Sequence, residues 1–263
     1  MLLAANISLL YNSLSIDKSL NAAAQDGFSW IEILAPYEHA PQWYADQLAQ
    51  TGLKLSLINT PGVQPEHPMG LAAQPDQVAT FQKSMGQAAA VCEATGCRCV
   101  HVLAGWQRED YSVRQQRDVL LDNLRWAHER FPDLTLHLEG LNRYDVPNYF
   151  YYRPDQVADV LTALTGLPVG MQFDFYHVVR EGLAITSQLA RHWAHVVHVQ
   201  VAGAPARHEP DTSRDGMMEG FQALNELDYG GLVGLEYRPA SGVAADGLHW
   251  LEPLKQQGLV RFT

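Results

Sequence analysis

Short apolar runs alternate with longer stretches of helical periodicity along the whole chain. Eight of the short runs are expected to form strands, over residues 2–8, 29–34, 53–60, 98–105, 134–140, 169–175, 196–203 and 232–239. Amphipathic patterns lie between them, for example over 76–95 and 114–131. Regular alternation of strand and helix is typical of βα units, which assemble into a parallel sheet.

Eight βα units predict an α/β fold, a single (β/α)8 TIM barrel formed by residues 1–263. The 263 residues match the usual size of that fold, whose functional residues lie at the C-terminal ends of the strands. An open, doubly wound sheet is the alternative. It is disfavoured because no predicted strand is followed by G-x-G-x-x-G or by a Walker loop.

Polar residues follow the alternation of faces in the last four strands. Over 134–140, Leu134, Leu136 and Leu138 share one face, whereas His137 and Glu139 share the other. We expect the apolar faces to pack against helices and the polar faces to line the barrel. The last inward polar residues of the four strands are then Glu139, Asp174, Gln200 and Glu236.

Three carboxylates and an amide in one barrel mouth would repel one another and lose hydration unless a positive charge lies between them. A divalent metal provides that charge, and oxygen ligands favour Mg²⁺ or Mn²⁺ over zinc. Each carboxylate alone could instead cap a helix or form an ion pair, but four residues in register favour a metal site. His137, Gln172 and His198, one layer deeper, are expected to orient the ligands.

Composition limits the partners. A net charge of −11 argues against nucleic acid, because phosphate binding needs clustered Lys and Arg. No apolar run is long enough to span a membrane, and "MLLAANISLLY" is expected to be a first strand rather than a signal peptide. Three cysteines without a leader favour the cytoplasm, and Cys97-x-Cys99 is interpreted as structural rather than as a zinc site.

Several segments together resemble one known family. "AANISLLY", "LEGLNRYDVPNYF", "MQFDFYHVVREG", "HVQVAGAPARHEP" and "GLEYRP" are similar to the hydroxypyruvate isomerase family, which includes 2-oxo-tetronate isomerases. That family belongs to the xylose-isomerase-like TIM barrels, together with ketose 3-epimerases and inosose dehydratases. The resemblance extends from end to end. It departs at 211–220, "DTSRDGMMEG", where the family commonly has a Gly-Glu-Ile-Asn type loop, so the resemblance supports the reaction type better than the substrate.

The resemblance implies roles for individual residues. Glu139 and Glu236 match the two glutamates that act as proton donor and acceptor in that family. The family's metal-ligand positions match Glu139, Asp174, Gln200 and Glu236. Gln200 stands where epimerases usually carry His, which favours the hydroxypyruvate isomerase branch. Asp145 matches an acidic residue that helps to position a glutamate in the epimerases. Substrate contacts are predicted for His177, expected in a loop, for Arg207 and Arg238, which suit a carboxylate, and for Asn142 and His101.

The implied function is a metal-dependent aldose–ketose type isomerase. It would act through an enediolate on a small 2-oxo acid such as hydroxypyruvate or 2-oxo-tetronate. A ketose 3-epimerase, an endonuclease IV-like phosphodiesterase and a non-catalytic sugar-acid binding barrel are the alternatives. The phosphodiesterase would need a His-rich zinc cluster and a basic groove, which the acidic composition and the oxygen ligands disfavour. The family resemblance also allows a homodimer.

Overall fold

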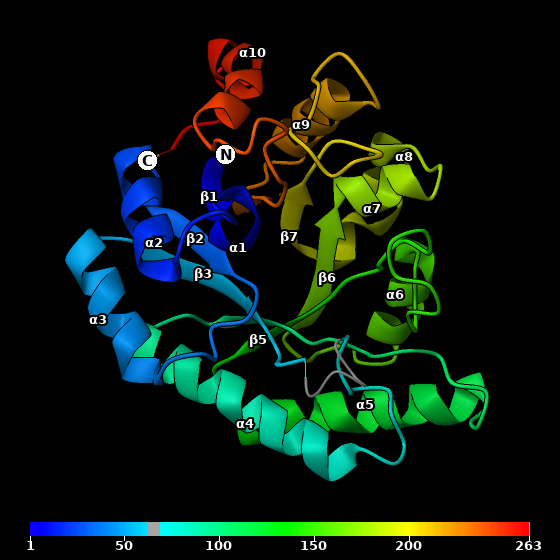
Figure 1. Ribbon diagram of the computed structural model, residues 1–263. Helices are drawn as coiled ribbons and strands as arrows, with labels where there is room; N and C mark the ends of the chain where they lie inside the picture. Colours follow the sequence, from blue (N-terminus) through cyan, green and yellow to red (C-terminus); the bar gives the residue numbers. More distant parts are fainter. Residues whose placement is uncertain (63–68, 263) are drawn as a thin grey trace.

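The computed structural model describes residues 1–62 and 69–262, and its centre is a closed barrel of parallel strands (Figure 1). The strands are β1 (Leu2–Asn6), β2 (Trp30–Ile33), β3 (Lys54–Asn59), β4 (Cys99–His101), β5 (Thr135–Leu138), β6 (Val169–Asp174), β7 (Val196–Val201) and β8 (Leu232–Leu235). Each strand pairs with the next, and β8 pairs with β1. The predicted (β/α)8 barrel is confirmed, and the open sheet is excluded.

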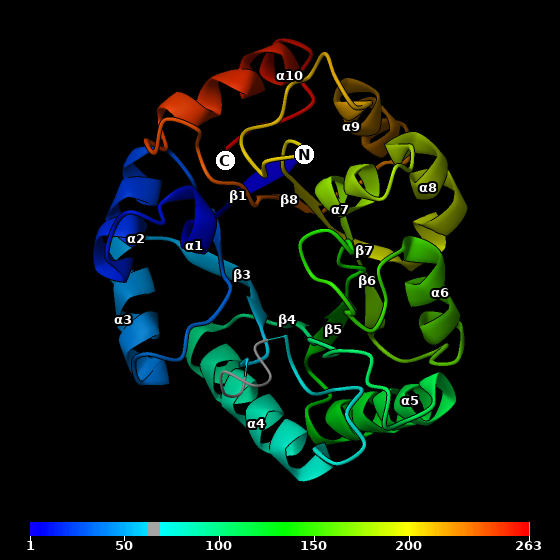
Figure 2. The ribbon, with the colours of Figure 1, turned by 45° about the vertical axis from the view of Figure 1, so that its right-hand side comes forward.

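Helices surround the barrel as an outer ring (Figure 2). They are α1 (Ile7–Leu10), α2 (Ile16–Gln25), α3 (Pro41–Thr51), α4 (Val78–Thr95), α5 (Val113–Arg130), α6 (Pro154–Thr162), α7 (Phe175–Arg180), α8 (Ile185–His192), α9 (Met217–Glu226) and α10 (Glu252–Gln256), with short 3₁₀ helices at Trp193–His195 and Asp246–Leu251. Among the residues described, no helix has the length and apolarity needed to cross a membrane.

The apolar faces of the strands form the layer between barrel and helices. Leu136 and Leu138 of β5 are fully buried, as the alternation of the sequence predicts. The two ends of the chain lie side by side in both views (Figures 1 and 2). There the amide of Leu3 donates to the carbonyl of Arg261 at 3.1 Å, which joins the C-terminal segment to the beginning of β1.

The strands end earlier than the apolar runs predict. The run over 98–105 forms a strand only as far as His101. Beyond it, the amide of Leu103 donates to Thr60 Oγ1 at 3.0 Å, and the amide of Ala104 donates to the Tyr149 hydroxyl at 2.9 Å. Because side chains of neighbouring loops accept these hydrogen bonds, the backbone leaves the sheet and turns into the barrel mouth.

His177 lies on a helix, and its prediction as a loop residue is wrong. The helix α7 begins directly after β6 because Asp174 caps it: Oδ1 of Asp174 accepts from the amide of Tyr176 at 2.8 Å. Asp174 therefore ends a strand and starts a helix. Its second oxygen, Oδ2, has no hydrogen-bond partner among the described residues.

The capping box of α5 yields a test of the fold that is independent of the site. Ser112 Oγ accepts from the amide of Gln115 at 3.2 Å, and the Gln115 side chain accepts from the amide of Ser112 at 2.9 Å. Ser112→Ala removes the cap, which costs about 1 kcal/mol. We expect a melting temperature lower by about 2–4 °C in calorimetry. Ser13→Ala, at an exposed position between α1 and α2, is the control, and an equal fall there would contradict the assignment.

Candidate metal centre and active site

A cavity of about 270 Å³ lies at the C-terminal ends of the strands. Its polar lining includes His101, Glu139, Gln172, His177, Arg207 and Glu236. A larger cavity, about 550 Å³, lies at the opposite end of the barrel, where residues 96–98 and 132–134 precede β4 and β5. Buried carboxyl groups gather at the smaller cavity, and the C-terminal face is where TIM barrels carry their chemistry, so the smaller cavity is the candidate site.

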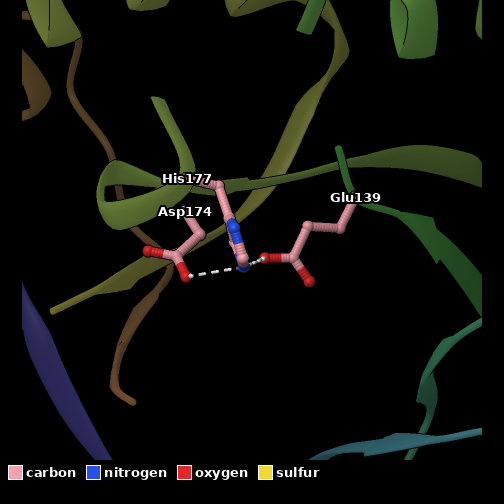
Figure 3. Close-up of side chains that lie close together, drawn as sticks. All are labelled: Glu139, Asp174 and His177. Carbon is pink, nitrogen blue, oxygen red and sulfur yellow. Dashed lines mark ion pairs between the residues drawn. The ribbon is translucent and has the colours of Figure 1, made fainter. Parts of the chain in front are cut away.

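Two buried carboxyl groups, Glu139 in the cavity lining and Asp174 beside it, each have one oxygen without a hydrogen-bond partner among the described residues. Oε2 of Glu139 accepts from Gln172 Nε2 at 2.8 Å, whereas Oε1 has no hydrogen-bond partner within the described part of the chain. In Asp174, Oδ2 likewise has none. Figure 3 shows both oxygens facing Nε2 of His177, which lies 3.7 Å from each. Leaving a buried acceptor unpaired is costly, so this geometry is suited to a ligand that binds both oxygens.

His177 is held in one tautomer. Its Nδ1 lies 3.0 Å from the backbone nitrogen of Asn142, and a backbone N–H can only donate. Nδ1 therefore accepts, and the ring proton is on Nε2. Burial lowers the pKa of His177 well below its ordinary value, so the ring is neutral. Nε2 consequently offers a hydrogen to the cavity, and we infer that it is a donor rather than a metal ligand.

Arg207 provides the positive charge that the structure shows among these carboxyl groups. Its Nη2 lies 2.8 Å from Oε1 of Glu236 and 3.5 Å from Oδ2 of Asp174, and its Nε donates to the carbonyl of Glu236 at 3.3 Å. Arg207 adopts a φ of 56°, which is uncommon outside glycine and is often found at functional sites. One guanidinium is thus close to three carboxyl groups, of which Glu139 is the third. A divalent cation would balance the negative charge that Arg207 leaves uncompensated.

Burial shifts the pKa values of all three carboxyl groups upward. Loss of hydration, together with the neighbouring Glu236 and Asp174, raises the pKa of Glu139 well above its ordinary value. Burial also raises the pKa of Asp174 to about 6 and that of Glu236 to about 8, although Arg207 opposes both shifts. The site therefore favours bound protons where no cation is present.

The set of donor atoms fits a hard cation. Gln200 is buried and pairs in register with Asp174 across β6 and β7, which brings a neutral amide next to the carboxyl groups. Oε1 of Gln200 accepts from Gln172 Nε2 at 2.5 Å and keeps a second lone pair. Carboxylate and amide oxygens with two unpaired acceptors are the ligands that Mg²⁺ and Mn²⁺ prefer.

The structure does not bring every predicted residue to the cavity, since two of the four predicted metal ligands, Asp174 and Gln200, are buried outside its lining. His101 lines it, with Nδ1 at 3.4 Å from Oε2 of Glu139, and burial lowers the pKa of His101 to about 3. Arg238 is exposed and lies outside the lining. Asn142 also lies outside it, and its Nδ2 donates to Asp145 at 2.9 Å and lies 2.8 Å from Nδ1 of His177. Sequence reasoning missed the pairing of Arg207 with the predicted metal ligands.

Comparisons with known proteins agree with the barrel fold and show the family of the chain. A family model described as xylose isomerase-like TIM barrel matches residues 20–254. The 2-oxo-tetronate isomerase of Cupriavidus necator is 36% identical over 95% of this chain and 97% of that protein. The hydroxypyruvate isomerase of Escherichia coli is 28% identical over 95% of this chain and 98% of that protein. A crystal structure described as an AP endonuclease of family 2 from Brucella melitensis superposes with a TM-score of 0.90, at 28% identity, covering 96% and 98% of the two chains.

The raised pKa values predict how a cation changes stability with pH. Between the ordinary 4.5 and about 8 of Glu236, the folded chain binds more protons than the unfolded chain, so the stability of metal-free protein falls as pH rises through this window. A cation that binds the carboxylates competes with these protons. After EDTA treatment, we expect Mn²⁺ to raise the melting temperature more at about pH 8 than at about pH 5.5. An equal or larger rise at the lower pH would argue against carboxylate ligands.

Proposed function

The chain belongs to the xylose isomerase-like TIM barrel family, and on that premise we propose that it is a metal-dependent isomerase of a small 2-oxo acid, with hydroxypyruvate and 2-oxo-tetronates as candidate substrates. The observation that carries the proposal is that Glu139 and Glu236, two buried carboxyl groups from β5 and β8, line one cavity of about 270 Å³. This volume suits a compact acid. A cytoplasmic location and a homodimer stay predictions.

Glu139, Asp174, Gln200 and Glu236 are the proposed metal ligands. The unpaired oxygens of Glu139 and Asp174 support this assignment, as does the excess of carboxyl groups over the single guanidinium of Arg207. When bound, Mg²⁺ or Mn²⁺ would supply positive charge for the two oxygens of a 2-oxo, 3-hydroxy substrate while the negative charge of an enediolate develops.

Glu139 and Glu236 are the proposed proton-transfer groups. In the forward direction, one carboxylate removes the proton from the carbon that carries the hydroxyl, and the protonated partner returns one to the former carbonyl carbon. A proton also moves from the hydroxyl oxygen to the other oxygen, so that the product is an isomer. This exchange needs one group ionised and one protonated, a state that two neighbouring carboxyl groups with coupled titrations can adopt.

Neutral and cationic donors around the cavity would orient the substrate. His177 presents its Nε2 hydrogen, and we assign Asn142 to holding that tautomer rather than to direct contact. Arg207 uses Nη2 and Nε in the contacts described above, so its Nη1 is suited to the substrate carboxylate. His101 remains a proposed contact as well, whereas the exposed Arg238 could reach substrate only above the cavity.

Exchange of carbon-bound hydrogen distinguishes the proposed isomerase from its alternatives. In D₂O with Mn²⁺, we expect deuterium incorporation into hydroxypyruvate or a 2-oxo-tetronate, together with the signals of the isomeric carbonyl compound, and loss of both after EDTA treatment. Proton NMR follows the reaction. Inversion at one carbon of a ketose without carbonyl migration would favour the 3-epimerase, and binding without exchange would favour the non-catalytic barrel.

Replacement of either glutamate should remove a proton-transfer group together with a proposed metal ligand. For Glu139→Gln and Glu236→Gln we expect kcat to fall by about 10²–10⁴-fold, because each variant loses a proton-transfer group. The pH profile of Glu236→Gln should also lose one limb of its bell shape. Glu38→Gln, at an exposed loop position after β2, is the matched control with unchanged kcat. A complete bell-shaped profile in Glu236→Gln would refute the assignment of this residue.

A further inference from the structure

Glu32 is a fully buried carboxyl group that the proposed reaction does not use. It projects from β2 across the barrel interior, where Oε1 lies 2.6 Å from His198 Nε2 and Oε2 accepts from Gln200 Nε2 at 2.8 Å and from Asn6 Nδ2 at 3.2 Å. The fold leaves space for it at Gly234 of β8, because a Cβ atom there would lie 2.2 Å from Oε1 of Glu32. Glu32 lies outside the cavity lining and both of its oxygens contact other side chains, so it is placed to act through those residues.

Hydrogen bonds connect Glu32 to the proposed metal ligands through two amides. Nε2 of Gln200 donates to Glu32 at 2.8 Å. Oε1 of Gln200 accepts from Nε2 of Gln172 at 2.5 Å, and the same nitrogen donates to Oε2 of Glu139 at 2.8 Å. A buried chain of four side chains therefore has a carboxylate at each end. Two of its members, Gln200 and Glu139, are proposed ligands.

The two end groups determine the orientation of both amides. A carboxylate only accepts, so Gln200 has to turn its NH₂ group toward Glu32 and its oxygen toward Gln172. The two hydrogens on Nε2 of Gln172 are then used by Gln200 and Glu139. If Gln200 rotated by 180°, its NH₂ group would face that of Gln172. Correcting the clash would turn the oxygen of Gln172 against the carboxylate of Glu139, an unfavourable contact in a buried site.

We propose that Glu32 is a positioning residue that fixes the amide of Gln200, so that its oxygen lies on the side of Glu139, where a cation would bind. The inference rests on the proposed metal site. It accounts for the presence of a fully buried carboxyl group beneath the cavity. It also explains how an amide, whose two ends are nearly equal in shape, can serve as a ligand of defined orientation.

A double-mutant cycle tests whether Glu32 acts through Gln200. Mn²⁺ affinity is measured by titration calorimetry for the unmodified chain, Glu32→Gln, Gln200→Leu and the double variant. We expect Glu32→Gln to weaken binding by about 10- to 100-fold in the unmodified chain and to have little effect when Gln200 is already Leu. An equal loss in both backgrounds would overturn the inference. Absence of Mn²⁺ binding to the unmodified chain would instead refute the proposed metal site.

Two further variants separate orientation from folding. Asn6→Ala is the matched control, because it removes a donor to Glu32 without reversing the amide chain, so its loss of affinity should be smaller than that of Glu32→Gln. In Glu32→Gln combined with Gln200→Glu, the amide at position 32 can donate to the carboxylate at position 200. The hydrogen bond between positions 32 and 200 is then reversed, but position 200 still accepts from Gln172, and we expect Mn²⁺ affinity to recover. A combined variant that is unfolded, or folded with affinity as weak as Glu32→Gln, would overturn the proposal.

Discussion

Mutual repulsion between buried carboxylates is the constraint on which the arrangement of the barrel mouth depends. Parallel strands bring their C-terminal ends to one rim, so acidic residues far apart in sequence, such as Glu139 and Glu236, lie within one small cavity. Closure of the barrel removes most of the water that would otherwise screen them. Every positive or donating group around the mouth can be understood as a response to that charge.

Three kinds of donor stabilise these carboxylates. Arg207 brings a permanent charge from the loop after β7, in a backbone conformation that side chains seldom adopt. Gln172 donates a hydrogen bond to one oxygen of Glu139, and the backbone amide of Tyr176 donates one to an oxygen of Asp174. His177, neutral and fixed by Asn142, offers a hydrogen from the side. The oxygens of Glu139 and Asp174 that lack a hydrogen-bond partner among the described residues mark the direction from which a cation would complete the site.

Local patterns in the sequence predicted the parts of this arrangement that depend on strand alternation. Period two along β5 to β8 was enough to select Glu139, Asp174, Gln200 and Glu236, because inward and outward positions follow from the pleat. Contacts across the barrel could not be found in this way. The reach of Glu32 from β2 to β7, and of Arg207 back to Glu236, depends on closure of the barrel and on a loop conformation. Neither is encoded in a window of neighbouring residues.

The space that Gly234 leaves for Glu32 has a consequence for how such barrels diverge. A side chain at position 234 would collide with the carboxylate, and a shorter residue at position 32 would leave a void beside the glycine. A change at either position alone would thus disturb the packing of the interior, although β2 and β8 are almost two hundred residues apart in sequence. We therefore expect residues 32 and 234 to change together in related barrels, because only a joint exchange keeps the interior filled without a collision.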